Sequence, residues 1–476
     1  MAPPKSNTTR KAPKEASSGR EGKKPGDKRN TPSPRNAQSQ ARSQPQKKKQ
    51  STEAEEENEN QIDISAVIPI TLQQLLLNVF KTALLSAPSS SRSQDQPGDR
   101  TEDAEEKKGE EALDVKTLIQ TIKSHLYNRD FDSAFADADE QLLRAYALRW
   151  SAARALGYAG LFKAILKVLV GDAAPAGGDS EEAGLNSTHV VCIGGGAGAE
   201  IVALAAAWRD LLDEEAGAIP GSSSTKEISN RMGAVSLDDT QHQTEKPEQE
   251  GQHLSPSPSL SSSSPSLSIT AVDIADWSSI VNRLSATILS SKVPSSSKSH
   301  PAPLLTADPQ NAAPSQSESE PEPDPRYNVS FKRLDVLSLS DSDLTSLFQT
   351  NTIQNKIVTL MFTLNELFST SMPKATAFLL RTTDLLQKGT ILLVVDSPGS
   401  YSTLKLGKAG AQQERQYPMK FLLDHTLLSV AKGRWERLYS QDSRWWRRDA
   451  NRLWYEVGEG AGLEDMRFQI HIYRRI

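Results

Sequence analysis

The chain has 476 residues, of which 36% are hydrophobic and 24% are charged, and its formal net charge is −5. Its single cysteine, Cys192, excludes an intramolecular disulfide and cysteine-based zinc sites, and the seven histidines show no metal-ligand spacing, so no metal is expected. No signal peptide and no apolar run of transmembrane length are found, so the sequence predicts a soluble, intracellular protein with no membrane partner.

Residues 1–60 lack large apolar side chains and are predicted to form a disordered tail, since they cannot bury enough surface to offset chain entropy. Within residues 1–50, fourteen Lys or Arg stand against three Asp or Glu. A basic tail of this kind suits RNA or nuclear import, because polyanions attract clustered cations. A solvated tail with no partner is an equally good interpretation, so the tail does not decide between nucleus, nucleolus and cytoplasm.

Two helical regions follow the tail. Apolar residues recur at helical spacing from residue 64 to 85, with Pro69 at the expected helix start, and a polar linker then completes the segment 61–112. A helical N-terminal extension is predicted over residues 113–185, with Leu118, Ile122 and Leu126 on one face.

From Thr188 the sequence pattern changes to short runs of β-branched residues separated by helical patterns, which predicts successive βα units and a mainly parallel sheet. Helices are expected near 198–213, 277–290, 340–350, 373–387 and 416–431. The domain 186–476 would contain two low-complexity surface insertions, near 214–267 and 291–326. The predicted strands are His189–Ile193, Ser268–Asp273, Asn328–Leu334, Lys356–Phe362, Thr390–Asp396 and, last, Met466–Tyr473.

The most informative segment runs from His189 to Glu200, where a hydrophobic strand enters a turn with four glycines in five positions. Glycine allows a tight turn and lets a ligand approach the backbone, and the following helix offers N–H groups. The spacing Gly194-x-Gly196-x-x-Ala199 satisfies the dinucleotide fingerprint, whereas Gly194-x-Gly196-x-Gly198 is similar to the first motif of class I methyltransferases. The glycines alone leave both cofactors open.

Two aspartates follow the next strands. Asp273 ends the second strand, where its carboxylate can accept hydrogen bonds from ribose hydroxyls, and either cofactor would use it. Asp335 follows the third strand at a position similar to the methyltransferase carboxylate that contacts the adenine amino group. The alternative for Asp335 is a helix cap or a solvated loop residue.

The fourth strand leads into Thr363-Leu-Asn365-Glu366, where class I methyltransferases present groups that face the substrate. The segment lacks the Asn/Asp-Pro-Pro-aromatic motif of amino methyltransferases, and Cys192 lies on the wrong side of the turn for covalent C5 chemistry. Direct transfer to nitrogen or oxygen remains, which needs alignment with the methyl group and a group that accepts or polarises the proton, and Asn365 and Glu366 are candidates to position the base. Glu366 could equally be a first-turn carboxylate stabilised by the helix dipole.

These motifs, with Leu393 to Tyr401 and Tyr146 to Tyr158, resemble the fungal 25S ribosomal RNA uridine-N3 methyltransferase family over about residues 113–476. The resemblance implies a Rossmann-like class I fold with a seven-stranded sheet and helices on both faces, S-adenosylmethionine as cofactor, and a uridine of ribosomal RNA or a pre-ribosomal particle as substrate. It implies cofactor contacts from Gly194, Gly196, Gly198, Asp273, Asp335, Val336 and Thr363. The rival functions are an NAD(P)-dependent oxidoreductase and a catalytically inactive ribosome-assembly factor.

Arginine and tryptophan residues are interleaved between Lys432 and Trp454. This pattern suits RNA, because guanidinium groups can bind phosphates and indole rings can stack on bases. The opposite interpretation places the tryptophans in the core and leaves the arginines solvated. Arg149 and Arg154, upstream, could likewise cap the cofactor pocket or lie on an outer face. The candidate RNA-binding residues are Arg434, Arg444, Trp445, Arg447 and Arg448.

Overall fold

The computed structural model describes residues 62–85, 113–128, 130–173, 187–218, 265–306, 326–348, 355–399, 401–406 and 413–476. The predicted tail 1–60, nearly all of the linker that follows residue 85 and the centres of both insertions lie outside these ranges. Within them, no helix combines the length and the apolar character needed to cross a membrane.

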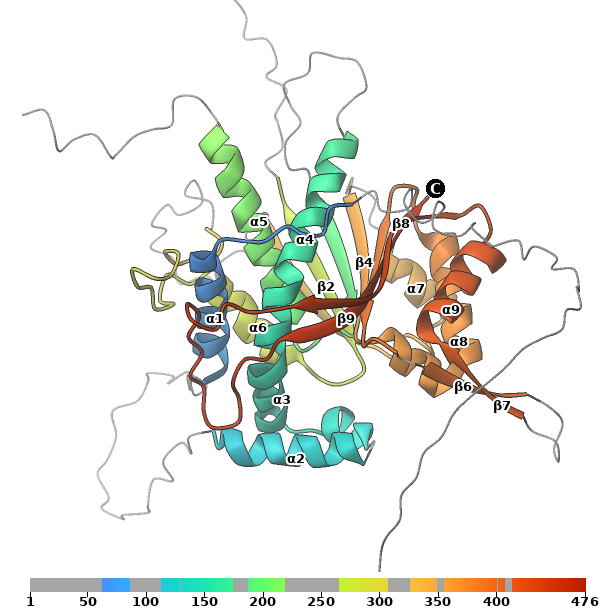
Figure 1. The fold of residues 1–476 in the computed structure, drawn as a ribbon, viewed down its shortest axis with the longest axis horizontal. Helices are drawn as coiled ribbons and strands as arrows, with labels where there is room; N and C mark the ends of the chain where they lie inside the picture. The colour runs from blue at the N-terminus through green and yellow to red at the C-terminus, as the bar shows by residue number, and fades with distance from the viewer. Residues whose placement is uncertain are drawn as a thin grey trace, which may run out of the picture. The chain divides into compact units, whose positions relative to one another are not determined.

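Seven strands form the central sheet, and they confirm the predicted mainly parallel topology (Figure 1). They are β1 (Thr188–Ile193), β2 (Leu267–Asp273), β3 (Tyr327–Arg333), β4 (Asn355–Met361), β5 (Ile391–Asp396), β8 (Trp435–Trp446) and β9 (Met466–Arg475). Their order is β3-β2-β1-β4-β5-β9-β8, and β1 to β5 are parallel. The last strand, β9, is antiparallel to both of its neighbours, as in class I methyltransferases.

Side chains that alternate along each strand divide the core into two layers. In β1, Val190 and Cys192 pack on one face, and Val191 and Ile193 pack on the other. Different helices cover the two faces (Figure 1). The first is covered by α1 (Ile70–Leu85), α4 (Ala152–Ala173), α5 (Ala199–Ala218) and α6 (Ser278–Ile288), and the second by α7 (Asp341–Phe348), α8 (Leu364–Leu385) and α9 (Met419–Asp424).

Helix α1 belongs to this core, although the sequence assigns it to a segment of its own. Leu72, Leu75 and Phe80 are fully buried in the same cluster as α4, α5 and α6. The end of α1 is fastened by two arginines, because Arg144 Nε donates to Leu84 O at 3.0 Å and Arg283 Nη1 donates to the carbonyl of Ala83 at 2.9 Å. The boundary predicted at residue 186 therefore divides one continuous core.

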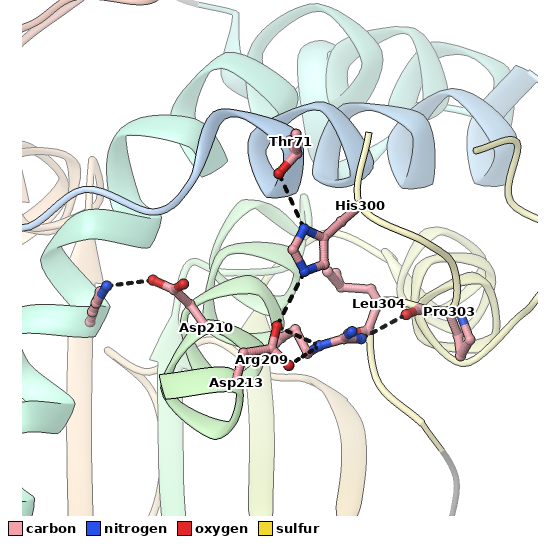
Figure 2. Close-up of polar contacts among 8 residues, drawn as sticks. Thr71, Arg209, Asp210, Asp213, His300, Pro303 and Leu304 are labelled. Atoms are coloured by element: carbon pink, nitrogen blue, oxygen red, sulfur yellow. Dashed lines mark hydrogen bonds and ion pairs between the residues drawn. The ribbon is translucent and has the colours of Figure 1, made fainter. Parts of the chain in front are cut away.

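The second insertion starts later than residue 291. Residues 291–306 form a packed connection in which Val293, Leu304 and Leu305 are buried. Arg209 of α5 donates to the carbonyl of Pro303 at 3.2 Å (Figure 2). Figure 2 also shows His300 between Thr71 of α1 and Asp213 of α5, at 3.2 and 3.3 Å.

The predicted N-terminal extension is mainly helical over its described residues. It contains α2 (Val115–Tyr127), the π-helical segment Asp132–Ala136, α3 (Glu140–Tyr146) and the π-helical segment Ala147–Ser151, which continues directly into α4. A small cluster around Ile122 and Leu142 joins α2 to α3.

Three elements near the carboxyl end differ from the prediction. Helix α8 begins at Leu364, nine residues before the predicted start, and a kink at Ser371 accommodates Pro373. The hairpin of β6 (Tyr401–Leu406) and β7 (Gln413–Pro418) was not predicted. Strand β8 was missed because two register shifts, after Arg437 and after Gln441, break its alternation.

Candidate active site

The glycine turn joins β1 to α5 and packs tightly against neighbouring strand ends. Gly194 and Gly198 have positive φ values of 75° and 81°, which favour glycine. A Cβ on Gly194 or on Gly196 would come within 3.0 Å of Thr363 or Trp277, respectively. These glycines are therefore required by the packing of the turn itself, a reason that sequence reasoning did not identify.

Asp273 ends β2 and forms one wall of this turn. Its Oδ2 accepts a hydrogen bond from Gly196 N at 3.2 Å, and its Oδ1 accepts one from Ala275 N at 3.2 Å. Burial raises the pKa of the Asp273 carboxyl to about 6, against these hydrogen bonds, which lower it. The structure thus brings Asp273 and the glycine turn together, as expected for neighbouring parallel strands.

Asp335 lies two residues beyond β3 and stabilises its own turn. Its Oδ1 accepts from Leu337 N at 3.0 Å, and its Oδ2 accepts from the hydroxyl of Ser338 at 2.6 Å. Val336 is buried, and Leu334 N donates to Asp273 O at 2.8 Å, so this turn is tied to the end of β2. The position of Asp335 at the end of β3 fits a carboxylate that contacts adenine. Its hydrogen bonds within the turn fit the other interpretation, a carboxylate that stabilises the loop.

An aromatic cluster from the N-terminal extension covers the glycine turn. Tyr146 lies 5.7 Å from the ring centroid of Trp277, the residue that packs on Gly196, and 4.9 Å from that of Trp150. Phe135 contacts Tyr146 edge-on at 5.1 Å. The spacing of Tyr146 and Trp150 predicts that they share one helix face, but the sequence does not predict that this face lies against the glycine turn.

Arg154 of α4 points into the same site. Its Nη1 donates to Tyr146 Oη at 3.0 Å, and its guanidinium lies 4.8 Å from the ring centroid of Phe362, which follows β4. Arg149, by contrast, is paired with Glu464 and donates to Gly462 O, which leaves it in a structural role. Of the two arginines considered from sequence, only Arg154 faces the site.

The residues after β4 form the opposite wall. Thr363 Oγ1 lies 3.2 Å from the carbonyl oxygens of both Ile193 and Met361, so it bridges the ends of β1 and β4. Asn365 and Glu366 occupy the first turn of α8. Asn365 N donates to Asp396 Oδ2 at 3.0 Å, which ties that turn to the end of β5.

Carboxylates dominate the electrostatics of the site. Burial raises the pKa of Glu200 to about 8, and desolvation by the surrounding chain together with the charge of Asp396 raises the pKa of Glu366 to about 7. Arg154 opposes both shifts, because its positive charge favours the ionised carboxylates. Glu200 Oε1 and Asn365 Oδ1 are buried without a hydrogen-bond partner among the described residues, which leaves two acceptors for a ligand.

Comparison with known proteins shows which cofactor the protein uses. A family described as "Putative SAM-dependent methyltransferase", where SAM is S-adenosylmethionine, matches residues 100–474. The chain belongs to this family. The methyltransferase is therefore SAM-dependent, and family membership decides against the rival function of an NAD(P)-dependent oxidoreductase.

A relative from Saccharomyces cerevisiae, strain S288c, is named 25S rRNA (uridine(2843)-N(3))-methyltransferase. It is 30% identical over 366 residues, which are 75% of this chain and 76% of the relative. Among solved structures, a Burkholderia thailandensis 1,6-didemethyltoxoflavin-N1-methyltransferase is 12% identical with a TM-score of 0.27, covering 75% of this chain and 87% of its own. CalS10, an amino pentose methyltransferase from Micromonospora echinaspora, is 9% identical with a TM-score of 0.24, covering 67% and 90%.

The residues present fit a SAM molecule. Its ribose has hydroxyl donors and its sulfonium and amino groups are cationic, so buried carboxylates and unpaired acceptors suit it better than a pyrophosphate. Glu200 and Asp273 supply these carboxylates beside the glycine turn, and Glu200 Oε1 has no partner of its own among the described residues.

The candidate RNA-binding residues of the methyltransferase lie on β8, in the turn before it and in the loop after it. Some side chains of this region are exposed, as RNA contacts require, and others are buried in the core. Trp445 is 52% exposed and contacts the guanidinium of Arg447 at 5.0 Å, whereas Trp435 is buried and donates to Thr383 Oγ1. Several arginines already have partners in the described chain: Arg434 pairs with Asp384, Arg444 donates to Ile64 O, Arg447 pairs with Asp465, and Arg448 is half-buried with its backbone N–H on Asp465.

Proposed function

We propose that this methyltransferase methylates N3 of a uridine in large-subunit ribosomal RNA by direct transfer. The yeast relative, whose name states this activity, supports the substrate, because the similarity extends over three quarters of each chain. Such a substrate would require the protein where that RNA is made or assembled, in the nucleolus, nucleus or cytoplasm. A pre-ribosomal particle is the corresponding partner.

The single cysteine supports direct rather than covalent transfer. Covalent C5 chemistry needs a thiolate that adds to the pyrimidine ring. Cys192 is buried inside β1, and burial raises the pKa of its thiol well above its usual value. A thiol in this state is a core residue and not a nucleophile.

We assign cofactor binding to the residues that surround the glycine turn. Gly194, Gly196 and Gly198 would approach the cofactor through their backbone, Asp273 would accept from its ribose, and Asp335 and Val336 would face its adenine. Thr363 holds the ends of β1 and β4 at the spacing that the pocket requires. Bound SAM supplies an electrophilic methyl group.

The observation that carries the catalytic assignment is the position and pKa of Glu366. Glu366 is exposed to solvent, yet desolvation by the surrounding chain and the charge of Asp396 raise its pKa to about 7. A carboxylate with this pKa can accept the imide proton of a uridine near neutral pH, because a base works best when its pKa is close to the working pH. Asn365, fixed beside it through Asp396, would orient the base.

The test is methyl transfer from labelled SAM to a transcribed fragment of large-subunit ribosomal RNA, with the product identified by mass spectrometry. We expect 3-methyluridine, and we expect Glu366→Gln to lower kcat by about 10²- to 10⁴-fold with the SAM Kd unchanged. Glu456→Gln, at an exposed position, is the control. Methylation at C5, or a wild-type protein that binds this RNA but transfers no methyl group, would contradict the proposal; the second outcome would favour an inactive assembly factor.

The exposed part of the β8 region is the proposed RNA surface. Trp445 and Arg447 present an indole and a guanidinium side by side to solvent. Arg434, Arg444 and Arg448 would add positive charge around them. Phosphate contacts predict that replacing Arg447 with Ala reduces the slope of log affinity against log salt by about one.

A further inference from the structure

A cavity of about 540 Å³ opens beside the methyl-transfer site, between the loop after β5 and the helix formed by α9 and the π-helical segment His425–Val430. Gln469 of β9 lines it and donates through Nε2 to Ser397 O at 2.7 Å. Gln469 is also the strand partner of Asp396, which accepts from Asn365 N. The cavity therefore begins one strand away from the first turn of α8.

Three aromatic side chains form a ladder along this wall. Phe421 and His425 share one face of the helix at four-residue spacing, and Tyr417 at the end of β7 stacks on Phe421 from the segment before the helix. The rings of Tyr417 and Phe421 are 5.5 Å apart with 19° between their planes, and those of Phe421 and His425 are 6.1 Å apart with 4° between theirs. Phe421 is nevertheless 51% exposed, and Tyr401 at the same cavity is 55% exposed.

The charged groups of the cavity are largely balanced. Asp424 pairs with Lys420 and Arg437, each at 3.2 Å, and accepts from the Tyr473 hydroxyl at 2.6 Å. The lining also includes the aromatic rings of Tyr401, Phe421 and His425 and the carboxylate of Asp442. The Gln469 amide, which contacts Ser397 O through Nε2 and His471 Nε2 through Oε1, adds a further polar group to this lining. A planar ligand with hydrogen-bonding edges fits this lining better than an aliphatic or highly charged one.

We propose that this cavity binds one unstacked nucleobase of the RNA substrate, which stacks on Phe421. Proteins that read RNA select unpaired bases and stack them on aromatic side chains, because each base has a π-face. The Gln469 amide and the Asp442 carboxylate then face the edge of the base. The inference rests on the proposed function, since it assigns a second contact to the same RNA strand.

The test compares Phe421→Ala with Phe421→Trp in the full chain. We expect the alanine variant to bind a fluorescent single-stranded fragment of large-subunit ribosomal RNA about tenfold more weakly and the tryptophan variant to bind it as wild type does. Fully paired RNA of equal length should bind both variants equally. Tyr127→Ala, which removes an 89% exposed aromatic ring from α2, is the matched control.

Two further measurements separate the possible failures. The SAM Kd of Phe421→Ala should equal that of wild type, which shows that the fold and the cofactor site are intact. If wild type transfers methyl groups to RNA and Phe421→Ala binds the single strand with unchanged affinity, the nucleobase cavity is refuted and the proposed function stands. If wild type transfers none, the proposed function fails, and a tenfold loss of RNA affinity in Phe421→Ala would still support the cavity.

Discussion

The guanidinium of Arg154 lies 4.8 Å from the ring centroid of Phe362, whose φ of 58° is the only positive value among the described non-glycine residues. An aromatic residue in this region carries roughly 1–2 kcal/mol of backbone strain. Phe362 N donates to Val395 O at 2.7 Å, so the strand pairing that holds β4 against β5 also holds the strained residue. Through this pair, the N-terminal extension reaches the turn that carries Glu366.

The first prediction concerns the charge of Arg154. Because Arg154 lowers the pKa of Glu366, Arg154→Gln should raise that pKa above about 7. A base of higher pKa becomes available only at higher pH, so the rising limb of the pH profile of kcat should move to higher pH. Tyr146→Phe, which removes the hydrogen bond to Arg154 but keeps its charge, should move it less. An unchanged profile in Arg154→Gln would show that Glu366 is not the titrating base.

The second prediction concerns Asp273 as a cofactor ligand. Asp273→Ala should abolish SAM binding measured by calorimetry, because a buried acceptor for the ribose hydroxyls is lost. The control is Asp276→Ala, which removes an exposed carboxylate three positions away that accepts a hydrogen bond from Ser278 N. This variant should bind SAM as wild type does. Equal affinities of the two variants would remove Asp273 from the site.

The third prediction follows from the buried Glu200. Folding raises its pKa from an ordinary 4.5 to about 8, so the native state holds the proton more tightly than the unfolded chain does. The free energy of unfolding should therefore fall as pH rises through this window. Glu200→Gln should remove that contribution, so its free energy of unfolding relative to wild type should rise by about 4–5 kcal/mol from pH 4 to pH 8.5 in urea titrations without SAM. The control is Glu215→Gln, on the exposed end of the same helix; a similar gain there would contradict this assignment.

The fourth prediction tests whether α1 is part of the catalytic core. Phe80 is fully buried, so Phe80→Ala should lower the free energy of unfolding by about 3–5 kcal/mol. Val67→Ala, at a 65% exposed position just before the helix, should change it by less than about 0.5 kcal/mol. A small effect of Phe80→Ala in denaturant unfolding would mean that α1 is dispensable.

Local patterns predicted the sheet and the turn, because both depend on residues close together in the chain. The run from His189 to Glu200 shows a buried strand, a glycine turn and a helix start within twelve positions. Asp273 could be placed because parallel strands all end at one edge. Strand β8 could not be predicted, since its register shifts remove the alternation that identifies a strand.

The rest of the site depends on contacts between distant segments. Arg154 and Tyr146 reach the glycine turn only because α4 packs on α5, and nothing within their own helix shows this partner. The amphipathic pattern of α1 predicted a buried face without saying against which helices it lies. Likewise, the exposure of Phe421 and the cavity beside it arise from the packing of α9 against β9 and the loop after β5.

Both low-complexity tracts lead to the start of a strand: one runs from Ala218, at the end of α5, to Leu267, and the other from Thr306, at the end of the packed connection after α6, to Tyr327. In a parallel sheet these joints lie at the amino ends of the strands, whereas Gly194, Asp273 and Thr363 lie at the carboxyl ends. A change of length at either joint would therefore leave the carboxyl ends of the strands, and the candidate active site there, in place.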